Sequence, residues 1–272
     1  MSEAVLEKPA DVATTTAVAR KSGGSSDAMR HILTIAKREI SGFFASPVGY
    51  VFIIIFLLLA GFLTFMVAGF FERGQANLLP FFAWHPWLYL FLVPAVGMRM
   101  WSEERRLGTI ELLLTMPITP WQAIAGKFLA SWAVLAIALA LTFPVVITVN
   151  YLGNPDNGVI LTSYIGSLLL AGAYLAVTAM TSAMTRNQVV SFILSVVICL
   201  FLILAGWPPV TNMLTQWASA GLVEVVAGFS VMTHFDSLQK GVIDSRDVLF
   251  FLSLIGFCLF ATSVIIRAHR AG

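Results

Sequence analysis

The chain has 272 residues, of which 58% are hydrophobic and only 11% are charged. A soluble domain usually carries about 25% charged residues, and its core could not bury this much apolar surface. The composition therefore excludes a soluble enzyme, a disordered chain and a nucleic-acid-binding domain, and it indicates an integral membrane protein. The net charge of +2 is too small to imply a polyanionic partner.

Six apolar stretches are candidates for membrane-spanning helices, so the predicted fold class is an all-α integral membrane protein. A helix needs about 20 mostly apolar residues to cross a hydrocarbon layer of about 30 Å. The expected spans lie near residues 50–70, 82–98, 124–150, 160–183, 188–206 and 248–266. The second is the least regular, because Pro80, Pro86 and Pro94 fall in or beside it and each proline removes a backbone donor.

The distribution of basic residues predicts the orientation of these spans. Thirteen of the sixteen Lys and Arg residues lie before the first span, between spans two and three, between spans four and five, or after the sixth. Cytoplasmic segments carry the excess of positive charge in membrane proteins. We therefore expect a multi-pass protein with both termini in the cytoplasm.

The chain begins with two segments that precede the first span. Residues 1–28 are rich in Ala, Thr, Ser and Gly and lack the apolar core of a signal peptide, which predicts a flexible cytoplasmic tail. In residues 29–46 apolar side chains recur at helical spacing, with Arg30, Lys37, Arg38 and Glu39 on the remaining arc. This pattern predicts a helix lying in the cytoplasmic membrane surface. It would be either a simple anchor or a lever joining a cytosolic partner to the first span.

A charged segment follows the second expected span. The segment contains Glu103, Glu104, Arg105, Arg106, Gly108, Thr109 and Glu111. We expect Thr109 to cap a short helix that carries Glu111 in its first turn and ends at Pro117. Thr119 and Gln122 then match a capping box, with a proline at the first helical position. On composition alone, a solvated loop is an equal alternative.

The segment between spans five and six, residues 207–247, is long for a connection without structure of its own. Residues 210–233 are largely apolar and are interrupted by glycines, which predicts short re-entrant helices on the outer side. Glu224 is either a functional acid at membrane depth or an exposed loop residue. We expect His234 and Asp236 to face water and not to bind a metal, since zinc sites need three or four converging ligands.

The order of residues in the charged segment resembles the permease subunits of type-2 ABC exporters. That family has an E-R-x-x-G-T-x-E-x-L-L-x-x-P stretch at this place and a Gly-Lys pair in the next helix. The matching residues here are Glu104, Arg105, Gly108, Thr109, Glu111, Leu113, Leu114, Pro117, Gly126 and Lys127. The resemblance implies that this segment is a cytoplasmic coupling helix, which docks in a groove of a separate ATP-binding subunit.

The resemblance covers residues 29–270, which would form one six-span permease domain. Short sequence matches within these residues point to one branch of the family. Residues 42–50, 152–158, 185–190 and 233–247 are similar to the branch that includes the gliding-motility permeases. The resemblance implies a bacterial inner-membrane protein that pairs with a second permease, identical or related. It also allows an auxiliary membrane or periplasmic subunit.

The sequence contains no phosphate-binding loop: Gly126-Lys127 is followed by Phe128, and position 121 is Trp where the first glycine would stand. We therefore expect a non-catalytic permease that binds no cofactor, with ATP and magnesium held by the partner ATPase. Cys199 and Cys258 lie in apolar runs and are expected to be buried rather than bridged or metal-bound.

Three other functions compete with an ATP-driven exporter. A secondary transporter usually needs an acid within the membrane or an unwound ion site, and the six expected spans contain no Asp or Glu. A membrane enzyme would need converging acid–base groups, and the spans offer neither paired carboxylates nor a His–Glu zinc pattern. A scaffold that transmits ATPase motion to periplasmic partners is the strongest alternative.

Overall fold

A computed structural model describes residues 25–109, 118–216 and 219–268, and every regular element in these ranges is helical. In chain order the elements are α2 (Ser25–Ala45), α3 (Pro47–Phe62), the π-helical turn η1 (Leu63–Val67), α4 (Leu79–Ala83), α5 (His85–Gly97), α6 (Arg99–Leu107), α8 (Pro120–Ala140), α9 (Phe143–Leu152), α10 (Asn157–Met184), α11 (Gln188–Leu204), α12 (Pro208–Leu214), α13 (Ala220–Gly228), α14 (Val231–Gln239) and α15 (Ser245–Ala268). The all-helical prediction is confirmed for the part of the chain described.

Within the described ranges, four helical segments are long and apolar enough to cross a membrane. They are Gly49–Val67, Pro120–Leu152, Asn157–Met184 and Ser245–Ala268, and the pair α11–α12 makes a fifth if its two helices, bent by 68°, form one span. Residues 82–98 do not qualify on length, because Trp84 separates α4 from an α5 of 13 residues. At 1.5 Å per residue, α5 alone is about 20 Å long, short of a hydrocarbon layer of about 30 Å.

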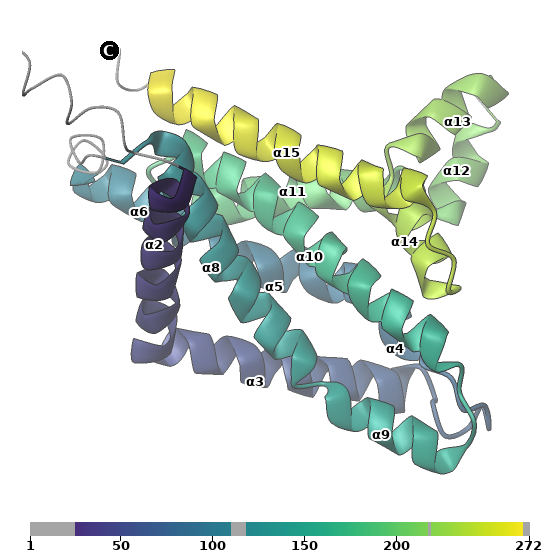
Figure 1. Cartoon of the computed structure of the whole chain (residues 1–272). Coiled ribbons are helices and arrows are strands. Elements are labelled where there is room, and N and C mark those ends of the chain that lie inside the picture. The colour runs from purple at the N-terminus through teal and green to yellow at the C-terminus, as the bar shows by residue number, and fades with distance from the viewer. Residues whose placement is uncertain (1–24, 110–117, 217–218, 269–272) are drawn as a thin grey trace, which may run out of the picture.

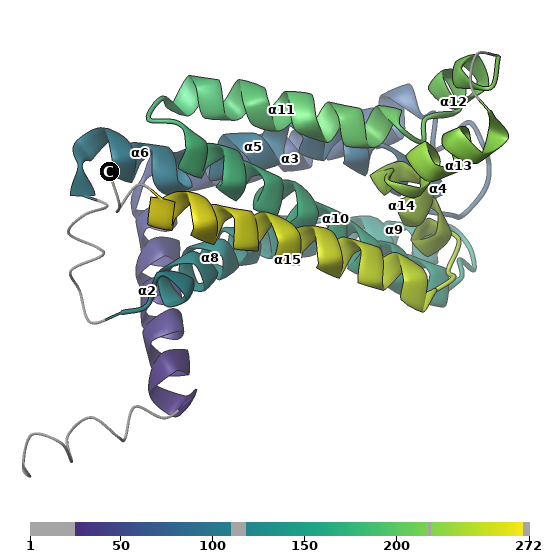
Figure 2. The ribbon, with the colours of Figure 1, turned by 90° about the horizontal axis from the view of Figure 1, so that it is seen from above.

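Helix α10 is the centre of the bundle (Figures 1 and 2). It packs against α5, α6, α8, α11, α14 and α15. Within its most apolar stretch 67% of the residues are buried in the protein, against at most 33% in the other three spans. Small residues permit this crowding: a Cβ at Gly172 would lie 3.0 Å from Nε1 of Trp132 on α8 and 3.2 Å from Ile255 on α15. The remaining helices are therefore arranged around α10.

The outer faces of the bundle are apolar. Large apolar side chains are more than half exposed on α3, α11 and α15, among them Leu58, Phe201 and Phe257. A water-soluble protein rarely exposes continuous apolar patches of this kind, whereas a lipid-facing helix requires them. The exposed surface therefore agrees with the composition in indicating a membrane protein.

The two ends of the bundle carry different segments (Figure 1). Helix α2, helix α6, the turn at 185–187 and the C-terminal end of α15 lie at one end, whereas α4 and α12–α14 lie at the other. The four segments for which the sequence predicted one side of the membrane therefore share one end of the molecule. Helix α2 runs across the direction of the spans, as a helix lying in a membrane surface would.

Helix α2 is held against the start of α8 by a close backbone approach. A Cβ at Gly126 would lie 2.8 Å from Cβ and Cγ2 of Ile35 and 3.1 Å from the carbonyl oxygen of Ile32. The capping box expected at Thr119 and Gln122 is confirmed: the amide of each residue bonds the side chain of the other, at 2.9 and 3.4 Å. The amphipathic helix therefore rests on a well-defined N-terminus of α8.

Short helices also form in the segment between the last two spans. Pro208 and Pro209 begin α12 after the bend, and a Cβ at Gly206 would collide with Ser230 and Thr233, so the chain can fold back closely there. No residue of α12 is buried. The expected short outer helices exist as α12 and α13, and their re-entry into the membrane stays a prediction.

We expect Gly97→Ala to destabilise the protein, because its Cβ would lie 2.7 Å from Cγ2 of Thr178 and 3.1 Å from Cδ1 of Leu175. Overpacking of this kind costs about 1–3 kcal/mol. Gly256→Ala on α15 is the matched control, since nothing lies within 4 Å of its Cβ. Thermal unfolding in detergent should show a lower midpoint for the first variant alone, and equal midpoints would contradict the tight α5–α10 contact.

Candidate functional site

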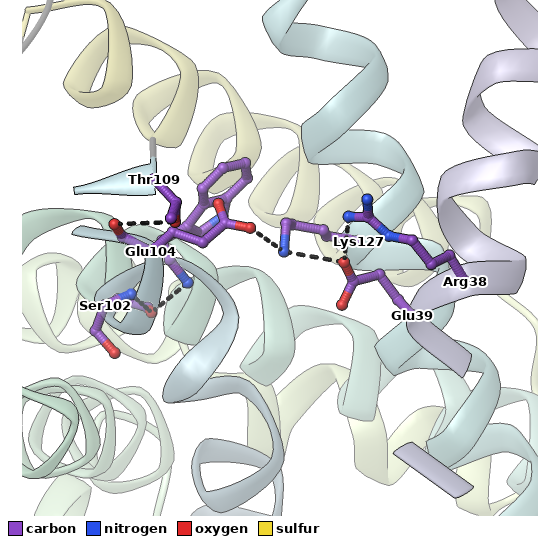
Figure 3. Close-up of polar contacts among 8 residues, drawn as sticks. Arg38, Glu39, Ser102, Glu104, Thr109 and Lys127 are labelled. Atoms are coloured by element: carbon purple, nitrogen blue, oxygen red, sulfur yellow. Dashed lines mark hydrogen bonds and ion pairs between the residues drawn. The ribbon is translucent and has the colours of Figure 1, made fainter. Parts of the chain in front are cut away.

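Helix α6 is a short charged helix that follows α5 after a single residue, Met98. It ends at Gly108, whose φ of 71° is left-handed and whose N–H donates to the carbonyl oxygen of Glu104. The Thr109 hydroxyl also donates to that oxygen, at 3.4 Å (Figure 3). Gly108 and Thr109 therefore cap the C-terminal end of α6. The helix expected from Thr109 to Pro117, with Glu111, falls in residues 110–117, outside the described residues.

Ser182, near the end of α10, fixes the start of α6. Its hydroxyl oxygen accepts hydrogen bonds from the amides of Trp101 and Ser102, both at 3.0 Å. The same hydroxyl donates to the carbonyl oxygen of Met98, at 2.9 Å. These bonds join the central helix to the junction of α5 and α6. Sequence reasoning missed Ser182, because a serine in an apolar helix carries no signal of its partner.

Arg105 strengthens the same attachment. Its guanidinium donates to the carbonyl oxygen of Ala183 at the end of α10. Burial lowers the pKa of Arg105, and the nearby guanidinium of Arg186 lowers it further. Because an arginine stays protonated even so, the contact remains charged. Arg105 therefore faces α10 instead of pointing away from the bundle.

Glu104 faces inward as well, toward Lys127 on α8 (Figure 3). The Lys127 ammonium lies 2.8 Å from Oε1 of Glu104 and 3.2 Å from Oε1 of Glu39 on α2. Only 7% of the Lys127 side chain is exposed, and its Nζ lies 5.5 Å from the centre of the Trp101 ring. Lys127 lies inside α8, the helix in which the resemblance expected the Gly-Lys pair, and it is the centre of an ion cluster.

The surroundings of Glu39 favour the ionised form of its carboxyl group. Burial alone would raise the pKa of Glu39, but Lys127 and the adjacent Arg38 outweigh it and lower the pKa below the ordinary value. Arg38 contributes a hydrogen bond of 3.1 Å to the same oxygen that receives Lys127. The carboxylate is therefore ionised at neutral pH, and the cluster of Glu39, Glu104 and Lys127 holds three charges near the protein interior.

A cavity of about 390 Å³ lies beside this cluster. Gly42 and Phe43 of α2 line one side, Arg99 and Glu103 of α6 line another, and Lys127 of α8 lies between them. The cavity separates these parts of α2 and α6, and the carboxylates of Glu39 and Glu104 meet at Lys127 beside it.

The far end of α6 is exposed. Glu103 and Arg106 lie 4.0 Å apart, with 41% and 60% of their side chains exposed, and Leu107 is 63% exposed. Gly108 and Thr109 follow them on the surface. Of the expected coupling residues that the structure describes, Glu103, Arg106, Gly108 and Thr109 are thus accessible to a partner, whereas Glu104 and Arg105 are held by this chain.

The three residues expected on the outer side, Glu224, His234 and Asp236, differ in their exposure. Glu224 on α13 and Asp236 on α14 are exposed. The expectation that His234 faces water is wrong: it is 5% exposed, its Nδ1 lies 2.6 Å from Oδ1 of Asp247, and its Nε2 lies 3.1 Å from the carbonyl oxygen of Gly228. Its ring also stacks on Phe250. The pair fastens α14 to α15, a contact between residues 13 apart that no sequence pattern announced.

In the described ranges, no group of three His, Cys, Asp or Glu side chains lies close enough together to hold a metal ion. Cys199 and Cys258 are both free and buried. The chemistry of the described site is therefore that of charge pairing and hydrogen bonding.

A family model described as ABC-2 family transporter protein matches residues 33–219, which is more than half of the chain. The match includes α2 from Leu33, all of α6, and the start of α8 with Lys127. No curated protein gives a match to this sequence. The candidate site thus lies within the matched region.

We expect Ser182→Ala to loosen the attachment of α6 to α10, because two buried backbone N–H groups would lose their shared acceptor. Leaving buried donors unsatisfied costs about 1–3 kcal/mol each. Thermal unfolding should show a clear loss of stability. Ser253→Ala on the exposed face of α15, whose hydroxyl bonds only to Phe250 of its own helix, should change little. An unaltered Ser182→Ala protein would contradict this account of the α5–α6 junction.

Proposed function

Because the chain belongs to the ABC-2 transporter family, we propose that it is the permease subunit of an export-type ABC transporter driven by a separate ATP-binding subunit. The observation that carries the proposal is α6, which is fixed to α10 and α8 along one side and exposed at its far end. A partner that moves this end would move helices deep in the bundle. The permease itself would be non-catalytic, with ATP and magnesium bound by the partner.

The exposed end of α6 is the proposed docking surface. Glu103 and Arg106 present both signs of charge beside the apolar Leu107, and they are paired only loosely. Complementary charges across an interface favour the correct partner and penalise wrong ones.

The proposed route of motion starts at this surface. ATP-driven closure of the partner would displace α6, and the bonds from Ser182 and Arg105 would carry the displacement to α10. Because α10 contacts six other helices, its movement would repack the bundle. Cores have discrete packings and do not deform continuously, so a small shift at α6 would be converted into a change of state.

We propose six crossings of a bacterial inner membrane, with both termini in the cytoplasm. Helix α2 and the end of α15 share one end of the bundle, which requires an even number of passages between the ends. The five candidates counted by length and composition are odd in number, so we propose that α4 and α5 together supply the remaining passage. Two such permeases, identical or related, would form the pathway.

A second candidate function is transmission of ATPase motion to an auxiliary membrane or periplasmic subunit. The pair α12–α13 favours it, because these helices stand away from the bundle and α12 has no buried residue (Figure 2). Glu224 lies on their exposed surface. Purification from the native cell in mild detergent separates the two functions: an ATP-binding subunit alone supports export, and an additional periplasmic chain supports mechanical transmission.

Arg106→Glu should weaken binding of the ATP-binding subunit, because a reversed charge at an interface costs several kcal/mol where like charges meet. We expect at least about tenfold less of that subunit to co-purify. Lys240→Glu, an exposed reversal at the opposite end, is the matched control. Equal co-purification in both variants would remove Arg106 from the docking surface, and absence of any ATP-binding subunit from the wild type would overturn the proposed function.

The proposed orientation predicts the labelling of introduced cysteines. Arg186→Cys and Ile243→Cys place exposed thiols at opposite ends, while the native Cys199 and Cys258 are buried. A membrane-impermeant maleimide should label position 243 in intact spheroplasts and position 186 only after the membrane is opened. The reverse pattern would invert the topology.

A further inference from the structure

We propose that Lys127 is a positioning residue that makes α2 move together with α6, so that displacement of α6 also reaches the first span, α3. This inference rests on the proposed function and names a second route of motion, separate from the one through α10. The route joins residues from three helices: Glu104 of α6, Lys127 of α8 and Glu39 of α2.

The first step is that Lys127 binds both carboxylates at once. Its ammonium lies within 2.8 Å of Glu104 and 3.2 Å of Glu39, and the two contacts use separate carboxylate groups on separate helices. An ammonium group has three donors and can serve both acceptors without choosing between them. The lysine is therefore a bridge, as Figure 3 shows.

The second step is that breaking either ion pair of Lys127 is energetically unfavourable. The Lys127 side chain is 7% exposed, and those of Glu104 and Glu39 are 20% and 27% exposed. Water has little access to replace a lost partner, and a buried charge left without its counter-charge is strongly unfavourable. Displacement of Glu104 therefore draws Lys127 and Glu39 with it.

The third step is that, in the part of the chain that the structure describes, no direct ion pair joins α2 to α6. The cavity of about 390 Å³ lies between Gly42 and Phe43 on one side and Arg99 and Glu103 on the other. Among the described residues, the ion pairs between these two helices run through Lys127. Loss of one carboxylate should thus uncouple α2 while α6 keeps its bonds to α10.

The fourth step is the tight corner between α2 and α3. Only Ser46 separates the two helices, and a Cβ at Gly49 would lie 2.6 Å from the carbonyl oxygen of Phe43. Such a close approach leaves little space for α2 to move without α3. Under this proposal helix α2 acts as a lever on α3, and Lys127 is the residue that attaches α2 to α6.

The test uses the complex as purified with its ATP-binding subunit. Spin labels at Leu33→Cys on α2 and Val264→Cys on α15, both exposed, report the position of α2. The native cysteines are buried and stay unlabelled. Distances between the labels are measured without nucleotide and after trapping with ATP and vanadate, and ATP hydrolysis is measured in the same samples.

In the otherwise wild-type chain we expect the distance to change on trapping. In Glu39→Ala the nucleotide-free distance should stay the same, the change on trapping should disappear, and ATP hydrolysis should remain within about twofold. Lys37→Ala, an exposed neighbour on α2, should behave as the wild type, and Glu39→Asp should restore at least part of the change. If the Lys127→Met variant folds, it should also lose the distance change on trapping. If it does not fold, the result for Glu39→Ala alone decides whether the bridge is required.

Two results would overturn the inference. One is a full distance change on trapping in Glu39→Ala, which would show that α2 follows α6 without the bridge. The other is the lack of any change in the wild type while the partner hydrolyses ATP. Failure of an ATP-binding subunit to co-purify is a different outcome, because it would contradict the proposed function itself.

Discussion

The burial of one positive charge determines how the functional end of this protein is built. Lys127 stands in the second turn of α8 with 7% of its side chain exposed, where an unpaired ammonium would be strongly unfavourable. Two carboxylates from helices far apart in the chain must therefore be held beside it. Each of those helices needs its own support to stay in place, and much of the surrounding packing supplies that support.

The support comes from two close contacts. On one side, Gly126 lets α2 approach α8 until Ile35 touches the backbone, which places Glu39 at the ammonium. On the other side, Ser182 and the end of α10 hold the α5–α6 junction, which places Glu104. The ion cluster is thus connected both to α2 and to the central helix, α10. Under the proposed function, a partner acting on α6 would act on both.

Much of this fold follows from the sequence, because its signals are local. Apolar length identifies the spans at α3, α8–α9, α10 and α15, and helical spacing identifies α2. The capping box at Thr119 depends on residues three apart, so it could be read directly. The break at Trp84 reduces the second expected span to the short α5, and the prolines there signalled irregularity without showing where the helix would divide.

The parts of the site that the sequence left open depend on contacts between distant residues. The motif includes residues of α6, although the sequence predicted the coupling helix further along the chain, from Thr109 to Pro117. It gave no sign that Glu104 and Arg105 turn inward while Glu103 and Arg106 stay exposed. The burial of Lys127 had no sequence signal, because its partners Glu39 and Glu104 are on other helices. His234 looked like a surface residue for the same reason, since its partner Asp247 reaches it only after α14 folds onto α15. A residue's burial is set by its neighbours in space, and one sequence does not list them.

The central claim, that α6 receives the force of an ATP-binding subunit, is tested most directly by cross-linking in native membranes. A photoreactive thiol probe attached at Leu107→Cys, on the exposed end of α6, should form a covalent adduct with an ATP-binding subunit. The same probe at Ile243→Cys, exposed at the opposite end, should not. An adduct from position 243 and none from position 107 would contradict the account.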